Sequence, residues 1–356
     1  MACMHRVREA TREGTQAMGA RRWAWVALLP AALLMTGAMA AETAVSFSLD
    51  FKFEGPSAPF LLAHDKGYYQ KETLDVTIDE SAGSLESIER VASGAYDMGF
   101  ADINSLIKFR DAKPNAPIKA VFMLYNRPPF AVIGRKSRGI NTPKDLEGKT
   151  LGAPSTDLAF AQWPIFVQAN GINAAKVTIE NVSFPVREPM LAAGQVDAIT
   201  GLSFSSYIDL KEKGVPVDDL VVLLMADYGV DLYGSAIIVN SKFADEHGEE
   251  VKGFLRAFMK ALRETVARPP IAVESVLKRN TQARKNVELD RLNMAIRENI
   301  VTPEVKVNGY GDIDSDRFAH AINQIALTHK FKATRPKPED VFDASFLPPA
   351  ADRKYK

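Results

Sequence analysis

The sequence predicts an α/β fold with two lobes, and two similar stretches about one hundred residues apart carry that prediction. Residues 93–105 and 193–205 each read as the end of an apolar helix, a glycine, an aspartate, a short apolar strand and a small polar loop. Gly94 and Gly194 can end a helix with a positive φ at little steric cost. The apolar segments that follow are too short for helices and suit buried parallel strands. We therefore expect two α/β units, each placing a polar loop at the carboxyl end of a strand, where open α/β sheets bind ligands.

The remaining elements are expected to alternate between strands and helices up to residue 240, after which the pattern is mostly helical. The apolar alternation from Val45 to Phe53 has the period of a strand. Further strands are expected at 74–78, 118–124, 130–134, 150–153, 177–182, 220–225 and 235–240, and later helices at 251–267, 271–278, 290–298 and 315–328. The tail contains four prolines and little regular pattern, so we expect it to lie along the surface.

The first forty residues predict an export signal that is cleaved near Ala40. Arg21 and Arg22 precede an apolar run over 23–35, and the small residues at 36–40 suit a signal peptidase. The run is shorter than the roughly 20 residues that span a bilayer, which makes a retained anchor the weaker interpretation. The true start is either Met1 or Met18. We expect a periplasmic protein that is soluble after export.

Composition excludes several classes of function. The 356 residues are 46% apolar and 25% charged, which allows a sizeable core and two lobes. Removing the five Arg and two Glu of residues 1–40 from 44 basic and 44 acidic residues leaves 39 and 42, a formal charge of −3. This balance argues against a nucleic-acid partner. The single cysteine, Cys3, lies in the leader, so we expect no thiol chemistry after export. No later segment is apolar and long enough to cross a membrane.

Two segments are expected to cross between the lobes. Arg127-Pro128-Pro129 interrupts an apolar stretch, and two consecutive prolines cannot donate to a β ladder, which predicts a rigid extended crossing. The second candidate, residues 227–230, separates two apolar segments. The chain would then leave one lobe, build the second, and return.

Four motifs in this order resemble a known family. They are residues 67–69 with 74–76, residues 94–99, residues 142–149 and residues 193–198. Together they resemble the periplasmic binding proteins of the nitrate, sulfonate and taurine ABC importers, including the thiamine-pyrimidine-binding relatives, over roughly residues 45–330.

The resemblance implies a type II periplasmic binding protein, with two Rossmann-like lobes joined by two crossings. Lobe 1 would be residues 44–131 plus 235–350, and lobe 2 residues 132–234. Such a protein closes on a small molecule and docks on a membrane ABC permease; we expect a monomer without cofactor or metal. One departure is Thr73, where relatives usually have Gly. A left-handed threonine would be strained, so we expect the turn to differ locally. There is also no cysteine-rich motif, so the chemistry of the eukaryotic enzyme relatives is not carried over.

Candidate ligand-binding residues lie in loops at strand ends and at helix N-termini, whose N–H groups favour polar or anionic ligands. Arg127 and Arg187 could form bidentate pairs with a carboxylate or sulfonate. Aromatic residues near the same loops could stack on a ring: Phe53, Tyr125, Trp163, Phe184, Phe204 and Tyr228. The full set of predicted site residues is Ser57, Gly83, Ser84, Asp102, Asn104, Arg127, Ser155, Thr156, Trp163, Arg187, Ser203 and Tyr228. For each of them helix capping, core packing or simple exposure is the alternative interpretation.

The chemistry of this set favours a small organic ligand over an inorganic ion. The negative charges of Asp102 and Asp157 would disfavour a bare inorganic anion in the site. We therefore expect an organic acid with an apolar or aromatic body, such as a sulfonate. A periplasmic enzyme is a competing hypothesis, although the histidines lack metal-ligand spacing and no nucleophile elbow occurs. A ligand-binding partner of a membrane sensor is another, since it would use the same fold.

Overall fold

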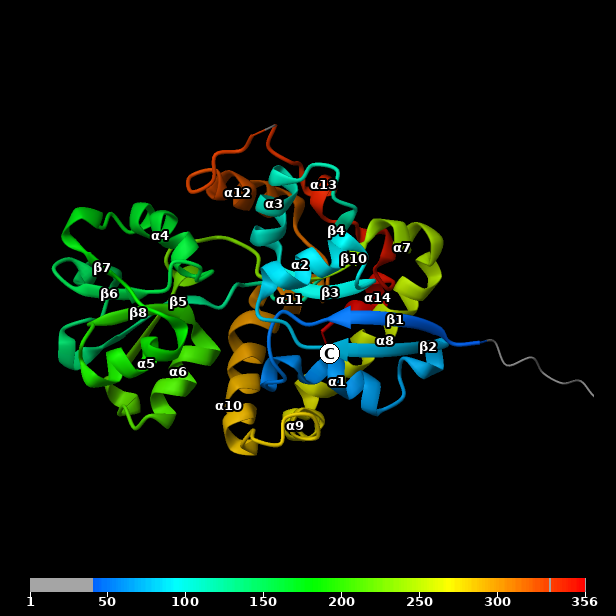
Figure 1. Cartoon of the computed structure of the whole chain (residues 1–356), viewed down its shortest axis with the longest axis horizontal. Helices are drawn as coiled ribbons and strands as arrows, with labels where there is room; N and C mark the ends of the chain where they lie inside the picture. Colours follow the sequence, from blue (N-terminus) through cyan, green and yellow to red (C-terminus); the bar gives the residue numbers. More distant parts are fainter. Residues whose placement is uncertain (1–40, 333, 356) are drawn as a thin grey trace, which may run out of the picture. The chain divides into compact units, whose positions relative to one another are not determined.

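The computed structural model describes residues 41–332 and 334–355, and within them the chain forms two mixed five-stranded sheets (Figure 1). The predicted export signal lies outside the described residues. The first sheet has the order β2-β1-β3-β10-β4 and the second the order β7-β6-β8-β5-β9. We refer to the residues around these sheets as lobe 1 and lobe 2; the residue boundaries predicted for them stay a prediction.

Each sheet combines parallel strands with one reversed strand. In the first sheet β1 (Thr43–Ser48) runs parallel to β2 (Leu74–Asp79) and β3 (Met98–Asp102), while β10 (Ser235–Asn240) runs antiparallel to β3 and to β4 (Ile118–Met123). In the second sheet β6 (Thr150–Ala153) runs parallel to β7 (Thr178–Asn181) and β8 (Ala198–Leu202), while β5 (Phe130–Arg135) runs antiparallel to β8 and β9 (Leu220–Leu224). In both sheets the reversed strand is therefore the fourth of five, and the predicted fold class is confirmed.

Helices cover both faces of each sheet. Up to β10 they are α1 (Ala58–Asp65), α2 (Ser84–Ser93), α3 (Ile103–Ala112), α4 (Trp163–Ala169), α5 (Phe184–Ala193) and α6 (Ser203–Glu212). After β10 they are α7 (Ser241–Glu246), α8 (Gly248–Ala267), α9 (Pro269–Leu277), α10 (Lys285–Ala295), α11 (Pro303–Asn308), α12 (Ser315–Ile325), α13 (Pro338–Val341) and α14 (Ala350–Arg353). In Figure 1, α5 and α6 lie on one side of the second sheet and α4 lies on the other.

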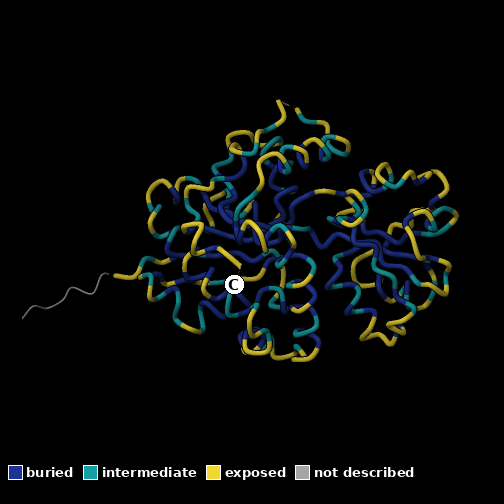
Figure 2. Tube along the Cα trace, turned by 180° about the vertical axis from the view of Figure 1, so that it is seen from behind, coloured by how far each residue is buried: buried dark blue, intermediate teal, exposed yellow. Residues whose placement is uncertain are grey.

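Strand β5 shows why both faces are covered. Phe130 and Val132 point into a core shared with α4, whereas Ala131 and Ile133 point into a second core shared with α5 and α6. A strand whose alternate residues enter two different cores must be buried on both faces. The inner strands β3, β10, β5 and β8 are accordingly buried over nearly their whole length (Figure 2), whereas the edge strand β7 is exposed.

The paired stretches act as scaffold, as the sequence predicts. Gly94 and Gly194 end α2 and α5 with φ values of 80° and 72°. The carboxylate of Asp97 then accepts hydrogen bonds from the Ser46 backbone N–H at 2.8 Å and the Ser46 hydroxyl at 2.7 Å, and Asp197 accepts one from the Thr150 N–H at 2.9 Å. Each aspartate thus links the start of its own strand to the neighbouring strand.

Two predictions about element boundaries are wrong. Strand β1 ends at Ser48 although the apolar alternation continues, because Phe51 is 45% exposed and the chain turns into a 3-10 helix at Gly55–Ser57. The tail packs into the fold: Val341 is fully buried, and the buried Arg353 guanidinium donates to the carbonyls of Pro348 at 2.9 Å and Tyr310 at 2.8 Å.

The turn before β2 also differs from expectation, because Thr73 does adopt the left-handed conformation, with φ 59° and ψ 37°. The turn is held there by backbone hydrogen bonds from Thr73 N–H to the Gln70 carbonyl at 3.0 Å and from Thr43 N–H to the Thr73 carbonyl at 2.9 Å. A β-branched residue in this region stores strain of about 1–2 kcal/mol.

We therefore expect Thr73→Gly to raise the free energy of unfolding by about 0.5–1 kcal/mol, since the relief of strain exceeds the added entropy of the unfolded chain. Urea denaturation measures this change. Thr77→Gly, on the exposed face of β2, is the control and should be destabilising. Equal losses of stability in both variants would contradict the strain at Thr73.

Candidate functional site

The two crossings between the sheets run side by side. Residues 124–129 lead from β4 to β5, and residues 225–234 lead from β9 back to β10. Gly234 N–H donates to the Tyr125 carbonyl at 2.9 Å, and a Cβ on Gly234 would lie 2.8 Å from the Tyr125 Cβ and 3.0 Å from the Pro128 Cα. Only a residue without a side chain allows this close approach.

One arginine of α12 binds both crossings. Nη2 of Arg317 donates to the carbonyl of Asn126 in the first crossing at 3.0 Å and to that of Leu232 in the second at 2.9 Å. Its Nε donates to Asp231 at 2.8 Å, and Nη1 donates to Glu304 at 2.8 Å. A planar guanidinium can bridge so many acceptors in fixed geometry. The crossings are therefore fastened to each other and to lobe 1.

The predicted site residues within the crossings are bound to other parts of the protein. Arg127 forms an ion pair with Asp227 of the second crossing, and its backbone exchanges hydrogen bonds with Asn299. The Tyr228 ring packs edge-on against Phe166, with centroids 6.2 Å apart. Arg127 thus already has a carboxylate partner, and a ligand role for either residue stays a prediction.

In lobe 1, the loop after β1 carries two carboxyl groups with strongly altered acidity. Burial raises the pKa of Asp50 to about 7, although the Ser235 hydroxyl donates to its carboxylate at 3.2 Å. Burial likewise raises the pKa of Glu54 to about 7, against the opposing charge of Arg291. Both residues are partly exposed to solvent. Carboxyl groups with such pKa values are typical of functional sites.

Helix α10 holds this loop in place. The carboxylate of Glu288 accepts a hydrogen bond from Gly55 N–H at 2.6 Å. A Cβ on Gly55 would lie 2.2 Å from the Glu288 carbonyl, so the loop can approach α10 this closely only with glycine. Arg291, only 7% exposed, lies 4.0 Å from the Glu54 carboxylate and 3.4 Å from that of Glu288. The two carboxyl groups are thus presented by a supported loop.

Aromatic rings from the two lobes meet beside this loop. Tyr125 follows β4 and Phe204 lies in the first turn of α6, and their ring centroids are 6.0 Å apart. Tyr125 also contacts Phe100 at 5.4 Å, edge to face. Burial raises the pKa of the Tyr125 hydroxyl, and the negative charges of Asp50 and Glu54 add to this effect. The carboxyl ends of strands from both sheets therefore converge on one aromatic contact.

The other predicted site residues of lobe 1 mostly form hydrogen bonds within that lobe. Asp102 caps α3 by accepting from the Ser105 N–H and hydroxyl, both at 2.8 Å, and Asn104 donates to Asp102 at 2.9 Å. The Ser84 hydroxyl accepts from the Asp102 N–H at 3.0 Å. Gly83 precedes α2 with φ 150°, and the Ser57 hydroxyl donates to the Glu54 carbonyl at 2.7 Å. Burial raises the pKa of Asp102.

The predicted residues of lobe 2 divide into a buried network and an exposed loop. Arg187 donates to Glu188 at 2.6 and 2.8 Å, to Asp157 at 3.2 Å and to the Ser206 hydroxyl at 2.9 Å. Its charge is therefore balanced within the protein. Trp163 is packed against Phe166, and Ser203 is fully buried with no hydrogen-bond partner for its hydroxyl. Ser155 and Thr156 are exposed at the end of β6.

Sequence reasoning missed Asp50, Glu54 and Arg291. The apolar alternation predicts a strand that includes Asp50, although a carboxylate close to the end of a strand is a signal that can identify a binding loop. Arg291 carries no comparable signal, because its contacts with Glu54 and lobe 2 exist only in the folded chain.

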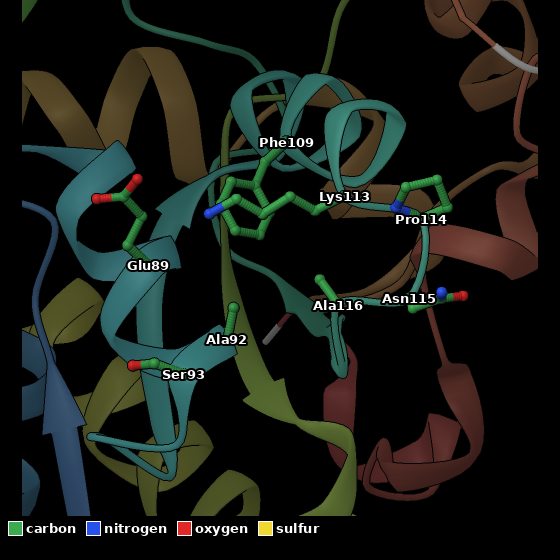
Figure 3. Close-up of a pocket in the computed structure, with 8 residues that line it drawn as sticks. All are labelled: Glu89, Ala92, Ser93, Phe109, Lys113, Pro114, Asn115 and Ala116. Carbon is green, nitrogen blue, oxygen red and sulfur yellow. The ribbon is translucent and has the colours of Figure 1, made fainter.

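Other features of the described residues do not form a competing site. No group of three or more His, Cys, Asp or Glu is placed to hold a metal ion within residues 41–332 and 334–355. In the same part of the chain, no helix combines the length and the apolar character needed to cross a membrane. A surface hollow of about 370 Å³ lies between the last turns of α2 and the segment 113–116 (Figure 3). Since α2 starts at the carboxyl end of β2, its last turns lie at the opposite edge of the sheet from the loops described above.

Comparison with known proteins identifies relatives of two kinds. Residues 55–272 match the family model described as NMT1/THI5 like. The chain is 27% identical over 219 residues to a riboflavin-binding protein of Chloroflexus aurantiacus, covering 61% of each chain. It is 26% identical over 224 residues to a formylaminopyrimidine-binding protein of Halalkalibacterium halodurans, covering 62% of this chain and 66% of that protein. A 4-amino-5-hydroxymethyl-2-methylpyrimidine phosphate synthase of Schizosaccharomyces pombe is 26% identical over 220 residues, covering 59% and 62%. The chain thus spans about six tenths of the length of these curated relatives.

Solved structures share the fold at low sequence identity. The periplasmic aliphatic sulphonate binding protein SsuA of Escherichia coli superposes with a TM-score of 0.65 at 14% identity, covering 89% of this chain and 93% of that chain. The periplasmic nitrate-binding protein NrtA of Synechocystis PCC 6803 gives a TM-score of 0.62 at 12% identity, covering 86% and 87%. At these identities the likeness shows the fold alone, which is that of periplasmic binding proteins.

We expect Arg317→Ala to lower the free energy of unfolding by about 2–3 kcal/mol, because it leaves two carboxylates and two carbonyls without their shared donor. Arg317→Lys should recover only part of this, since an ammonium group cannot bridge both crossings. Urea denaturation provides the measurement, and Arg335→Ala, at an exposed arginine bonded to Asn323, is the matched control. A loss in Arg317→Ala no larger than in the control would contradict the role assigned to Arg317.

The raised pKa of Asp50 predicts a pH-dependent stability difference between the native chain and Asp50→Asn. Between the ordinary aspartate pKa near 4 and the folded value of about 7, the folded protein binds the extra proton, so stability falls as pH rises through this window. Asparagine stays neutral, so the variant should match the native chain at pH 4 and exceed its free energy of unfolding by about 1–2 kcal/mol at pH 8. Denaturation across pH 4–8 tests this, with the exposed Asp75→Asn as control. Parallel pH profiles for all three chains would refute it.

Proposed function

Because the chain belongs to the NMT1/THI5 like family and has the fold of periplasmic binding proteins, we propose that it is an extracytoplasmic solute-binding protein. It binds one small organic molecule between its lobes without turnover, and delivers it to a membrane ABC permease. The proposal includes export with cleavage near Ala40 and a monomeric mature chain. The sharing of the fold with sulphonate- and nitrate-binding proteins supports it.

The observation that carries this proposal is the convergence of both lobes on one aromatic and acidic region. Tyr125 of lobe 1 contacts Phe204 of lobe 2, and the loop with Asp50 and Glu54 lies on the same side of the first sheet. Aromatic rings supply apolar faces for a flat ligand, and carboxyl groups accept hydrogen bonds from its N–H or amino groups. Open α/β sheets bind ligands at such carboxyl strand ends.

The charge distribution refines the ligand class expected from the sequence. Arg127, Arg187 and Arg291 each have carboxylate partners within the chain. An anionic ligand would have to displace such a partner, whereas a ligand with hydrogen-bond donors gains from the carboxyls of Asp50 and Glu54. We therefore favour a nitrogen-containing ring compound over a sulfonate. The riboflavin- and formylaminopyrimidine-binding relatives support this choice.

An enzyme and a partner of a membrane sensor are the two alternative functions. The synthases among the relatives favour an enzyme that acts on a pyrimidine. We favour reversible binding, because Asp102 and Arg187, two buried charged residues near the strand ends, are engaged in helix capping and ion pairs rather than placed beside a nucleophile. A partner of a membrane sensor would bind solute in the same way and differ only in the protein that it contacts.

A thermal-shift panel on protein freed of copurified ligand tests the proposal. The probes are riboflavin, formylaminopyrimidine, an alkanesulfonate and nitrate. We expect a rise in melting temperature with at least one of the two nitrogen-ring compounds, since a ligand that binds only the folded state stabilises it. Asp50→Ala should then weaken binding of that compound about tenfold, and the exposed Asp75→Ala should leave it unchanged. No shift with any probe, together with conversion of a pyrimidine substrate, would overturn the proposed function.

A further inference from the structure

Helices α6 of lobe 2 and α10 of lobe 1 run alongside each other in opposite directions and exchange charged contacts. Arg291 donates to Asp209 at 2.6 Å, Lys211 donates to Asp290 at 2.5 Å, and Arg284 forms an ion pair with Glu212. In each pair one residue belongs to α6 and the other to α10 or, for Arg284, to the residue that precedes α10. The positive and negative charges alternate between the helices, so neither presents a single sign to the other.

The contacts follow one another outward from the crossings. At the crossings, Ser203 N–H donates to the Pro129 carbonyl at 2.7 Å, and Asn299 binds the Arg127 backbone. Arg291 contacts the Ser205 hydroxyl at 3.3 Å one step further along α6. The pairs of Asp209, Lys211 and Glu212 lie still further out, at a rise of about 1.5 Å per helical residue. A rotation of one lobe about the crossings would therefore displace these outer ion pairs the most.

The same contacts reach the loop that carries Asp50 and Glu54. Arg291 binds Asp209 of lobe 2 while lying 4.0 Å from the Glu54 carboxylate of lobe 1. It is one of the few arginines that are nearly fully buried, at 7% exposure. A change at Glu54 on ligand binding thus acts directly on a residue that joins the two lobes.

We propose that the ion pairs between α6 and α10 form a clasp that holds the lobes closed, so that their strength sets the balance between closed and open protein. The proposal rests on the proposed solute-binding function for its purpose, because a longer-lived closed state retains the solute. The clasp itself is a property of the chain without ligand and can be tested without knowing the solute.

The outer pairs are weak enough to be adjusted. The side chains of Lys211 and Asp290 are 39% and 41% exposed, and those of Arg284 and Glu212 are 63% and 24% exposed. Exposed pairs are screened by salt, and each shifts an equilibrium by no more than about fivefold. The clasp is therefore expected to loosen at high ionic strength and to respond to single charge changes.

Distances between the lobes measured by pulsed electron paramagnetic resonance test the clasp. Spin labels are placed at Leu85→Cys and Val186→Cys, which are exposed in the first turns of α2 and α5, in the full chain carrying Cys3→Ser. We expect Lys211→Glu to lower the closed-to-open ratio about threefold, and raising NaCl from 0.05 to 1 M to do the same to the native chain. The double variant Lys211→Glu with Asp290→Lys should restore the native distances.

A control variant tests whether the effect is specific to the ion pairs between α6 and α10. Lys252→Glu removes a similarly exposed pair with Glu249 that lies within α8 of lobe 1, and it should leave the distances unchanged. Distances that respond neither to Lys211→Glu nor to salt would overturn the clasp, as would an equal response to Lys252→Glu. If the solute panel fails while these distances respond as expected, the proposed function is wrong and the clasp stands.

Discussion

The arrangement of both lobes depends on one guanidinium group. Arg317 donates to carbonyls in both crossings and to the carboxylates of Asp231 and Glu304. The first crossing is therefore anchored to lobe 1 as far as Asn126, and the second crossing is anchored from Asp231 onward. Bending between the lobes is then confined to the residues between these anchors and the second sheet. There Pro128 and Pro129 fix their own φ values in one crossing, while the ion pair of Arg127 with Asp227 ties it to the other. A short connection tied at two points limits the residues at which the chain can bend between the lobes.

This restriction matters because the groups assigned to ligand binding come from both sides. The loop after β1 keeps two carboxyls in partly buried positions where their ionisation is suppressed, and α10 supplies the hydrogen bond and the arginine that hold the loop there. Keeping such groups desolvated costs stability that a ligand with N–H donors can return when it binds. In the proposed site, lobe 2 contributes Phe204 and the exposed polar loop of Ser155 and Thr156. We therefore propose that lobe 1 supplies hydrogen bonds to the ligand and that lobe 2 supplies an apolar wall.

The sequence predicts the repeated scaffold well and the site only in part. Gly94 and Gly194 with their aspartates act locally, through a helix end and one hydrogen bond to the next strand, so a local pattern is sufficient to find them. The apolar alternation continues beyond Ser48 and so predicts a longer strand than the structure contains. Phe51 fits this alternation but is exposed to solvent. Steric strain argues against a left-handed Thr73, but backbone hydrogen bonds on both sides of the residue impose this conformation. Glu54 and Arg291 meet across most of the chain length, and no local pattern reports such a contact.

We propose that the protein binds a nitrogen-containing ring compound reversibly and does not transform it. The most direct measurement is to saturate the protein with riboflavin or formylaminopyrimidine, remove the excess, denature the protein and identify the released compound by mass spectrometry. We predict one equivalent of the unchanged compound per chain for at least one of the two. Release of a chemically altered product would contradict the claim, and so would the absence of any retained compound.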